Sequence, residues 1–568
     1  MKIALITVNY NGKKDTLELL NSLKQLHTTN YELITIVVDN GSDDGLVSKL
    51  VKDYPEVVVL QNGVNKGFGG GFNRGLEYGL IWGADYFLIL NNDTLINDKD
   101  LVNKLIETTK LDDRIGLVAP KILFAPGFEF HKDRYKKDDF GKVIWYAGGS
   151  FDHDNLLSHQ RGINEVDSGK YDLVEEVDFA NATCLLIKRE VLEKVGLFNE
   201  EYFAYFEDNE FSFRVSKAGF KKFYNGKASI YHKVSQTAGI GSPITDYFHT
   251  RNRLYLGMKY AKLRTQLAVL RQALKFLFFG RHAQRRGVLD FILGVKGGIP
   301  EVTKEPEKFE FPYKLSIVIV NYNTANLTKK LLQSIFTHPM PCMGTEVLVL
   351  DNGSKDNCKE VIKEFLPKIK YLENQENEGF SKGYNKLIRY SQGEYFLMLN
   401  SDIEVLENSL AEIVKWEDEF QAEAVLGGKL VFPDKSKQDS AFHLPTIWGA
   451  FKEYFLAQKG SYFMYEPKGE KPSKVEGLVM ACFLIPHQII NKVGLLDEGT
   501  FIFFEDIEYC RRLKKMGVPI YFVPSAKFIH HHGASTKKIG QEKAMALLQK
   551  SVFSYYLGFK NWSKIGQS

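Results

Sequence analysis

The sequence predicts an α/β protein of two similar domains in tandem, each with a mostly parallel central sheet, joined by a basic helical segment. Three observations lead to this prediction. The chain has 568 residues, several times the size of a typical domain. One set of motifs occurs twice along it, and within each copy short apolar runs alternate with segments of helical spacing. The apolar share of 44% and the charged share of 25% are typical of folded proteins and exclude a disordered chain.

Internal repetition is the strongest of these signals. The segments Leu5–Asn11, Val38–Ser42 and Asn65–Phe68 all recur with the same offset of 312 residues. The segment Phe87–Asp93 recurs with an offset of 309, and the block Phe206–His232 recurs with an offset of 298. Offsets that hold within a block and shrink between blocks are typical of two copies of one domain with different loop lengths.

Each copy has the pattern of an alternating α/β domain. In the first copy, we expect buried strands over 3–8, 34–38, 57–60 and 86–90, where the residues are mainly Val, Ile and Leu. Leucines at positions 17, 20, 23 and 26 have helical spacing between the first two strands. Continuous apolar strands separated by helices predict a parallel sheet, and in such sheets ligands bind beyond the carboxyl ends of the strands.

The predicted domains span 1–246 and 313–568, the second with helices at the C-terminus, and the segment 247–312 connects them. The window 247–289 holds ten Lys or Arg residues and no Asp or Glu. Its leucines at 263, 267, 270, 274 and 277 form a helical stripe, which Arg264, Arg271 and Lys275 flank. This helix either packs between the two domains or lies on the anionic surface of a membrane. A nucleic-acid partner is not expected, since no recognition module accompanies the basic window.

Polar residues that follow the apolar runs indicate a ligand site in each copy. In the first copy they are Asn9, Asp39, Asn65 and Asp93, and in the second Asn321, Asp351, Asn377 and Asp402. Asp39 and Asp351 enter Asn-Gly-Ser turns, where the carboxylate either forms an Asx-turn or accepts a hydrogen bond from a nucleotide. The glycine-rich stretch 67–71 lacks the GxGxxG spacing, so we exclude a dinucleotide-dependent hydride transfer.

Two further motifs contribute acids and a histidine. Asp93 and Asp402 end the sequences Asn-Asn-Asp and Asn-Ser-Asp, where a carboxylate can hold a divalent cation against a diphosphate. The pairs Glu207–Asp208 and Glu505–Asp506 open predicted amphipathic helices, so their aspartates are either N-caps or general bases. A histidine lies 24 residues after each aspartate, at His232 and His530, and is a plausible metal ligand.

Together these motifs resemble the family 2 glycosyltransferases with the Rossmann-like GT-A fold, particularly the rhamnosyltransferase-like and galactofuranosyltransferase-like branch. The similarity covers roughly 1–260 and 313–535. Five motifs carry it: Val-Asn-Tyr-Asn, Asp-Asn-Gly-Ser, Asn-x-Gly-Phe, an Asn-x-Asp variant of the DxD motif, and Phe-Glu-Asp followed by His. The variant motif has Asn91 and Asn400 where the family has its first Asp, which leaves fewer carboxylates for a cation.

The resemblance implies a nucleotide-diphosphate-sugar donor and a role for each motif. Asp208 and Asp506 would be the general bases, while Asp93, His232, Asp402 and His530 would bind Mg²⁺ or Mn²⁺. The donor-binding positions that it implies are Asn9, Asp39, Asn65, Gly67, Asn73 and Asn92 in the first copy and Asn321, Asp351, Asn377, Gly379, Asn385 and Ser401 in the second.

These expectations favour a bifunctional inverting glycosyltransferase of the hexosyltransferase type. It would move sugars from UDP- or dTDP-sugars to a growing surface glycan or a lipid-linked acceptor. One alternative is a single catalytic domain beside a glycan-binding or scaffolding copy, and another is a sugar nucleotidyltransferase. Glu207 or Glu505 is an alternative base.

Location and redox state follow from the composition. There is no run of about 18 apolar residues and no secretion signal at the N-terminus, so we expect a cytoplasmic protein. Peripheral attachment to the inner face of the cell membrane is compatible with this expectation. Five cysteines in this length exclude a disulfide framework, and Cys184 and Cys482 are predicted core residues.

Overall fold

A computed structural model describes residues 1–28, 31–234, 242–303, 309–338, 344–445, 464–499 and 504–531. The chain divides into two compact units, Met1–Glu310 and Phe311–Ser568. The helices expected at the C-terminus lie outside the described residues. Within the described ranges, no helix combines the length and apolar character that a bilayer span requires.

The first unit is built on a ten-stranded mixed sheet with the order β10-β12-β6-β11-β4-β1-β2-β3, in which β5 pairs with β12 and β7 pairs with β6. The four strands expected from the apolar runs form its parallel half: β1 (Lys2–Asn9), β2 (Glu32–Asp39), β3 (Val57–Gln61) and β4 (Tyr86–Asn91). The remaining strands are β5 (Thr94–Ile96), β6 (Ile115–Phe124), β7 (Ile144–Tyr146), β10 (Val174–Glu176), β11 (Cys184–Lys188) and β12 (Lys221–His232). A separate hairpin consists of β8 (Gly149–Asp152) and β9 (Leu157–Gln160).

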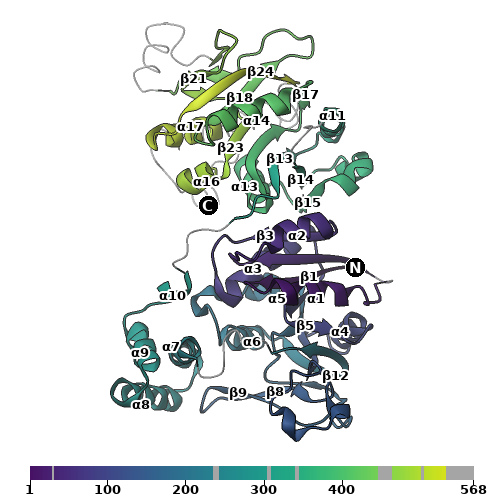
Figure 1. Cartoon of the computed structure of the whole chain (residues 1–568), viewed down its shortest axis with the longest axis vertical. Coiled ribbons are helices and arrows are strands. Elements are labelled where there is room, and N and C mark those ends of the chain that lie inside the picture. Colours follow the sequence, from purple (N-terminus) through teal and green to yellow (C-terminus); the bar gives the residue numbers. More distant parts are fainter. Residues whose placement is uncertain are drawn as a thin grey trace, which may run out of the picture. The chain divides into compact units, whose positions relative to one another are not determined.

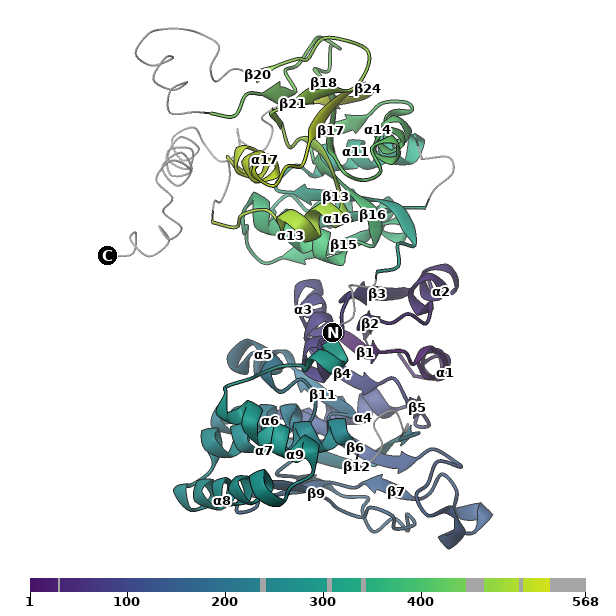
Figure 2. The same cartoon turned by 60° about the vertical axis from the view of Figure 1, so that its left-hand side comes forward.

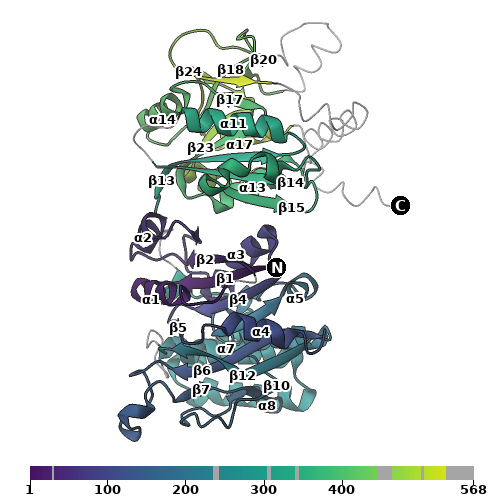
Figure 3. The ribbon, with the colours of Figure 1, turned by 90° about the vertical axis from the view of Figure 1, so that its right-hand side faces the viewer.

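Helices cover this sheet on both faces, as Figures 1 and 3 show. They are α1 (Lys13–Leu23), α2 (Leu46–Asp53), α3 (Gly67–Trp82), α4 (Leu101–Thr109), α5 (Arg189–Val195) and α6 (Glu207–Lys217). Three short 3₁₀ turns span Lys132–Arg134, Lys137–Asp139 and Glu200–Tyr202. Cys184 lies fully buried in the core, as predicted.

The glycine-rich stretch serves helix packing. Gly71, Gly75 and Gly79 lie one turn apart on α3 and face the sheet. A Cβ at Gly75 would approach Ile6 Cγ2 to 2.4 Å, and one at Gly71 would approach Val8 Cγ1 to 2.7 Å. Only glycine therefore allows α3 to lie this close to β1.

The basic segment after residue 242 is helical, as predicted. It forms α7 (Pro243–Tyr260), α8 (Leu263–Phe279) and α9 (His282–Ile292), followed by the short α10 (Pro300–Thr303). Figures 1 and 2 show α7, α8 and α9 side by side at the edge of the first unit. These three helices contact one another and belong to that unit.

The second unit repeats the architecture with a nine-stranded sheet in the order β15-β14-β13-β16-β23-β18-β24-β17, and β21 pairs with β24. Its strands are β13 (Tyr313–Asn321), β14 (Thr345–Asn352), β15 (Lys370–Asn374), β16 (Gly393–Asn400), β17 (Ile403–Val405), β18 (Val425–Val431), β21 (Ser473–Val475), β23 (Cys482–Pro486) and β24 (Ile520–His530). A small sheet contains β19 (Ala441–Phe442), β20 (Met464–Tyr465) and β22 (Gly477–Leu478). The helices are α11 (Ala325–Thr337), α12 (Cys358–Val361), α13 (Phe380–Tyr390), α14 (Ser409–Glu419), α16 (His487–Val493) and α17 (Glu505–Lys515), with a 3₁₀ turn at Lys363–Lys368.

Candidate active sites

The first polar cluster lies where β1 and β2 end, because parallel pairing sets Asn9 beside Asp39. Both side chains are buried. The Asn9 amide donates to Asp39 Oδ1 at 3.2 Å and to Ser42 Oγ at 2.9 Å. Asp39 Oδ2 accepts from the backbone N–H groups of Gly41 and Ser42, so the Asx-turn is formed. Burial raises the pKa of Asp39. The turn and a nucleotide contact are compatible, because a carboxylate has further lone pairs.

The second unit repeats this cluster at the ends of β13 and β14. The Asn321 amide donates to Asp351 Oδ1 at 3.3 Å and to Ser354 Oγ at 3.0 Å. Asp351 accepts in turn from the Ser354 backbone N–H at 3.2 Å, and burial raises its pKa. Ser42 and Ser354 were not singled out in the sequence, although both lie in the repeated Asp-Asn-Gly-Ser motif.

A line of hydrogen bonds connects this cluster to the Asn-x-Asp motif. Thr16 Oγ1 donates to Asn9 Oδ1 at 2.9 Å, and the Asn92 amide donates to Thr16 Oγ1 at 3.1 Å. In the second unit, the connection runs through Thr324, whose Oγ1 donates to Asn321 Oδ1 at 2.9 Å and lies 2.7 Å from Ser401 Oγ. Two motifs that are more than 80 residues apart in the first copy therefore form one network.

Asn40 ties the first cluster to the Asn-x-Gly-Phe loop. Its amide donates to Asn65 Oδ1 at 3.0 Å and to the Gly67 carbonyl oxygen at 3.1 Å. Asn65 Oδ1 also accepts from the Gly67 N–H at 2.9 Å. The second unit makes the same three bonds through Asn352, Asn377 and Gly379. Asn40 and Asn352 are site residues that the sequence reasoning missed, and their signal was their place in the repeated motif.

Three hydrogen bonds bring the first turns of α3 onto the loop that precedes Glu207–Asp208. The Phe68 N–H donates to the Phe203 carbonyl oxygen at 2.7 Å. The Asn73 amide donates to the Phe198 carbonyl oxygen and to Glu200 Oε1, both at 2.9 Å. In the second unit, the Asn385 amide donates to the Leu496 carbonyl oxygen and to Glu498 Oε1, again at 2.9 Å each. These contacts give Asn73 and Asn385 a positioning role, and direct donor binding by them stays a prediction.

The loop before α6 has a strained backbone. Phe203, Tyr205 and Phe206 have φ values of 64°, 64° and 71°, in a region that side chains with a Cβ rarely occupy. Phe504 has the same φ of 71° before α17. Such strain persists where the surrounding structure holds it and clusters at functional sites.

The helix α7 holds this strained loop. The buried Asn252 amide donates to the carbonyl oxygens of Tyr202, Ala204 and Tyr205 at 2.7 to 2.8 Å. Arg251, which is fully buried, donates to the Tyr202 carbonyl oxygen at 3.2 Å. The sequence pointed to neither residue, since the signals of this window are its positive charge and its leucine stripe.

The acid pairs begin the helices that follow. Phe206 and Phe504 are the N-caps of α6 and α17, so the interpretation of the aspartates as N-caps is wrong. Burial raises the pKa of Asp208 and of Asp506 to about 6. Burial, and then the charge of the neighbouring aspartate, raise the pKa of Glu505 to about 8 and that of Glu207 well above its ordinary value.

Each Asn-x-Asp aspartate lies against the predicted histidine. Pairing of β5 with β12 places His232 opposite Thr94, and His232 Nε2 lies 3.2 Å from Asp93 Oδ1. His530 Nε2 lies 3.4 Å from Asp402 Oδ1 for the same reason. All four side chains are buried. The structure thus brings together the pair that the sequence predicted in each copy.

These pairs fit a divalent cation as a partial set of ligands. Neighbouring ligands around one ion lie about 3 Å apart, and Mn²⁺ accepts both carboxylate and imidazole. No group of three His, Cys, Asp or Glu side chains suited to a metal occurs in the described residues. Oxygens from a bound diphosphate would have to complete the coordination, as they commonly do for such ions.

The charges of two of these motifs act on one neighbour in the second unit. In the second unit, burial raises the pKa of Tyr384, and the charges of Asp402 and Glu505 raise it further. In the first unit, the charge of Asp208 adds to the burial that raises the pKa of Tyr146.

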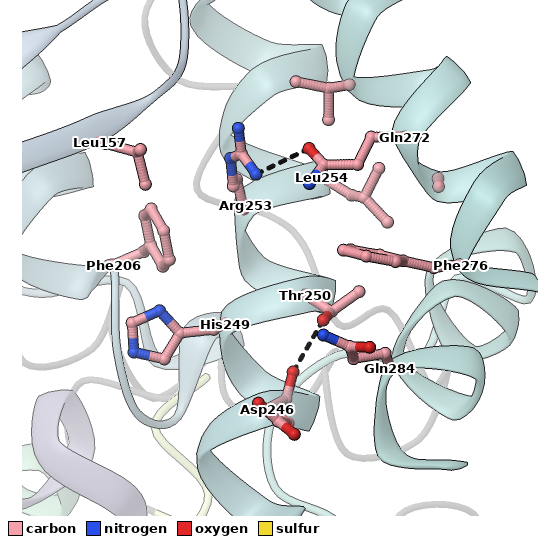
Figure 4. A pocket seen from close by; sticks show the side chains of 12 residues that line it. Leu157, Phe206, Asp246, His249, Thr250, Arg253, Leu254, Gln272, Phe276 and Gln284 are labelled. Atoms are coloured by element: carbon pink, nitrogen blue, oxygen red, sulfur yellow. Dashed lines mark hydrogen bonds between the residues drawn. The ribbon is translucent and has the colours of Figure 1, made fainter. Parts of the chain in front are cut away.

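A cavity of about 160 Å³ lies beside Phe206, the residue before Glu207–Asp208. Figure 4 shows side chains from α7, α8 and α9 around it, with His249 and Arg253 as polar groups. Arg253 Nη1 donates to Gln272 Oε1 at 2.8 Å. Burial lowers the pKa of His249, so its imidazole is neutral near pH 7.

Comparison with known proteins identifies the family. The family model described as glycosyl transferase family 2 matches residues 4–196 and again residues 316–494. The chain belongs to glycosyl transferase family 2. It is a glycosyltransferase, and both units have the GT-A fold that the repeated motifs predicted.

Relatives at low identity include two rhamnosyltransferases. The N-acetylglucosaminyl-diphospho-decaprenol L-rhamnosyltransferase of Mycobacterium tuberculosis is 24% identical over 245 residues, which cover 42% of this chain and 78% of that protein. The dTDP-rhamnosyl transferase RfbF of Shigella flexneri is 24% identical over 225 residues, 39% of this chain and 70% of that protein. Among solved structures, a mannosyltransferase from Pyrobaculum calidifontis in complex with GDP-Man and Mn²⁺ matches 52% of this chain and 76% of its own, with 14% identity and a TM-score of 0.31.

Proposed function

We propose that each unit of this glycosyltransferase transfers a sugar from a nucleotide-diphosphate donor, with inversion, so that the chain is bifunctional. The observation that carries the proposal is the retention of the same three polar groupings in both units. Each unit has the Asn–Asp cluster at its strand ends, the Asp–His pair and the largely buried Glu–Asp pair after a left-handed residue. A unit that only bound glycan would have no need for these acids.

Asp208 and Asp506 are the proposed bases. With pKa values of about 6, both are largely ionised near pH 7 and still basic enough to take a proton. Glu505, with a pKa of about 8, is largely protonated there, which favours the aspartate over the glutamate. In the second unit, the pair Glu505–Asp506 therefore holds about one negative charge at neutral pH.

The proposed reaction is one displacement. The aspartate takes the proton of an acceptor hydroxyl, and the hydroxyl oxygen forms a bond to the anomeric carbon of the donor. The bond from that carbon to the phosphate oxygen breaks, and its electron pair leaves with the nucleoside diphosphate. Attack from the face opposite the leaving group inverts the configuration.

The donor's diphosphate is assigned to the Asp–His pairs, and its nucleoside to the clusters at Asp39 and Asp351. Asp93 with His232, and Asp402 with His530, would hold Mg²⁺ or Mn²⁺. A bound cation would offset the charge that develops on the departing diphosphate. The similarity to enzymes named for dTDP-rhamnosyl and diphospho-decaprenol substrates supports a UDP- or dTDP-sugar donor and a glycan or lipid-linked acceptor.

Product analysis of single base variants tests the proposal. With a panel of UDP- and dTDP-sugars and a lipid-linked acceptor extract, mass spectrometry should show that Asp208→Asn and Asp506→Asn each remove a different sugar addition. Exposed acids in the same units provide matched controls, Asp113→Asn and Glu423→Gln, and these variants should retain both additions.

Three outcomes would contradict parts of the proposal. Full activity in both Asn variants would reject the base assignment. Loss of all transfer in one variant and no change in the other would support a single catalytic unit beside a glycan-binding unit. Release of pyrophosphate instead of a nucleoside diphosphate would identify a sugar nucleotidyltransferase.

A further inference from the structure

The helix α8 presents an apolar stripe to solvent. Its residues Leu263, Leu267, Leu270 and Leu274 are 38% to 70% exposed, and Phe278 extends the stripe at 67%. Of the exposed large apolar side chains in the described part of the chain, nine lie between positions 263 and 293. A patch of this kind on the surface of a folded unit marks an interaction surface.

The opposite face of α8 is the one that packs on the unit. Thr265, Val269 and Ala273 are buried, and the helix contacts α7 and α9. The leucine stripe is therefore a second apolar face and not the one that folding buries. An ordinary surface helix has a polar face in this position, so α8 departs from the usual pattern.

Cations flank the stripe, and α8 itself contains no acid. Arg264, Arg271 and Lys275 lie along one side of it, and Lys262 precedes the helix. All four side chains are exposed, and none forms an ion pair with a carboxylate among the described residues. Elsewhere in the window, Lys259 forms an ion pair with Glu210, and Arg281 forms one with Asp246. The positive charge that remains is concentrated beside the leucines.

We propose that this outer face of α8, Leu263–Phe279, binds the surface of an anionic lipid bilayer. Leucine and phenylalanine side chains at this spacing would enter the boundary between headgroups and acyl chains, while long basic side chains reach the headgroup phosphates. A polybasic flank adds attraction to anionic lipid. The helix lies in the plane of the membrane and does not cross it.

The helix α8 also lines the cavity beside Phe206, next to the acid pair proposed as the first active site. The inner face of α8 supplies Val269, Ala273 and Phe276 to the cavity beside Phe206. Binding of the outer face would therefore bring that cavity to the membrane surface, where a lipid-linked acceptor resides. The membrane proposal itself rests on α8 alone and does not depend on the reaction assigned to either unit.

Vesicle binding of the full chain tests the proposal. We expect the wild-type protein to sediment with vesicles that contain 30% phosphatidylglycerol, to bind pure phosphatidylcholine much more weakly, and to lose binding as salt is raised. The double variant Leu267→Glu/Leu274→Glu should lower the partition coefficient on the order of 100-fold or more. The triple variant Arg264→Gln/Arg271→Gln/Lys275→Gln should lower it on the order of 100-fold, about fivefold for each charge.

Matched variants away from α8 control for general effects of charge. Leu111→Glu/Leu173→Glu changes two leucines that are 67% and 53% exposed, and it should leave vesicle binding unchanged. The triple variant Lys14→Gln/Lys132→Gln/Lys137→Gln removes three exposed cations and should have an effect of at most a few-fold. Circular dichroism and transfer to a soluble acceptor should be unchanged in the α8 variants, which separates this proposal from the proposed reaction.

Two results would overturn the proposal. One is equal binding of wild type and the Leu267→Glu/Leu274→Glu variant to anionic vesicles. The other is a combination of two findings. Light scattering would show that wild type is a dimer and that the Leu267→Glu/Leu274→Glu variant is a monomer, and wild type would not bind vesicles. The second result would assign the stripe to contact with another copy of the chain.

Discussion

Glu505→Gln isolates the half-buried acid beside the proposed base of the second unit. Burial, and then the charge of Asp506, raise the pKa of Glu505 to about 8 from an ordinary 4.5, and Glu505 Oε2 accepts no hydrogen bond within the described residues. An acid with a higher pKa in the folded than in the unfolded chain destabilises the fold as the pH rises, because unfolding lets it ionise in water. Stability is therefore lost between pH 4.5 and about 8.

The size of the effect follows from this difference in pKa. If it were fully realised, it would correspond to about 5 kcal/mol in the free energy of unfolding. Water reaches part of the Glu505 side chain, so we expect roughly half of that value, about 2–3 kcal/mol. Glutamine has the same shape without the charge. The variant should therefore match wild type at about pH 5 and exceed its stability by this amount at about pH 9.

Urea unfolding of the full chain at three pH values, with hydrogen exchange in peptides from α17 as the local readout, measures the difference. Glu423→Gln changes an exposed glutamate in the same unit, and its effect should not vary with pH. A stability difference between Glu505→Gln and wild type that stays constant from low to high pH would refute the reasoning, because it would show that Glu505 ionises at its ordinary pKa.

Two further substitutions test the networks that position the first site. Asn9→Ala removes a fully buried amide and leaves its buried hydrogen-bond partners unsatisfied. In urea titrations it should lower the free energy of unfolding by about 2–3 kcal/mol. The control Asn155→Ala changes an exposed residue and should lower it by less than about 1 kcal/mol. Gly67→Ala places a Cβ 2.1 Å from the Phe203 carbonyl oxygen at a φ of 72°, so it should cost about 2–4 kcal/mol and remove one sugar addition from the product spectrum. Gly127→Ala, at a φ of 85° with no atom near its Cβ, should cost only about 1 kcal/mol and leave transfer intact. Equal effects of the two glycine substitutions would contradict the role given to the contact with Phe203.

The repeated motifs made the fold predictable, together with two of the neighbour relations within each candidate site. Strand-end residues such as Asn9 and Asp39 could be placed side by side because parallel pairing brings the carboxyl ends of neighbouring strands together. Asp93 and His232 could be matched because each lies in a motif that recurs in the second copy. In each case, the local sequence carries the information, since strand ends and helix starts depend on short-range patterns.

The same sequence did not reveal how the polar groups share their hydrogen bonds. Asn73 was predicted to bind the donor, which stays a prediction, and the sequence did not show that its amide also holds the loop at Phe198 and Glu200. Asn252 was not predicted at all, although it holds the left-handed loop before Asp208. Such partners are distant in the chain, and no spacing rule reports which backbone carbonyl a buried amide will reach.

By itself, the sequence determined the two α/β units, the order of their motifs and the family, because periodicity and repetition are written along the chain. Only the tertiary structure decided which face of α8 is buried and what environment surrounds the acid pairs. Val269 and Leu267 are both apolar, and the packing of α7 and α9 settled which of them reaches solvent. Likewise, the pKa of Asp208 depends on how far folding buries its carboxyl group. The residues that bury it are distant in the chain, so the sequence alone does not give this pKa.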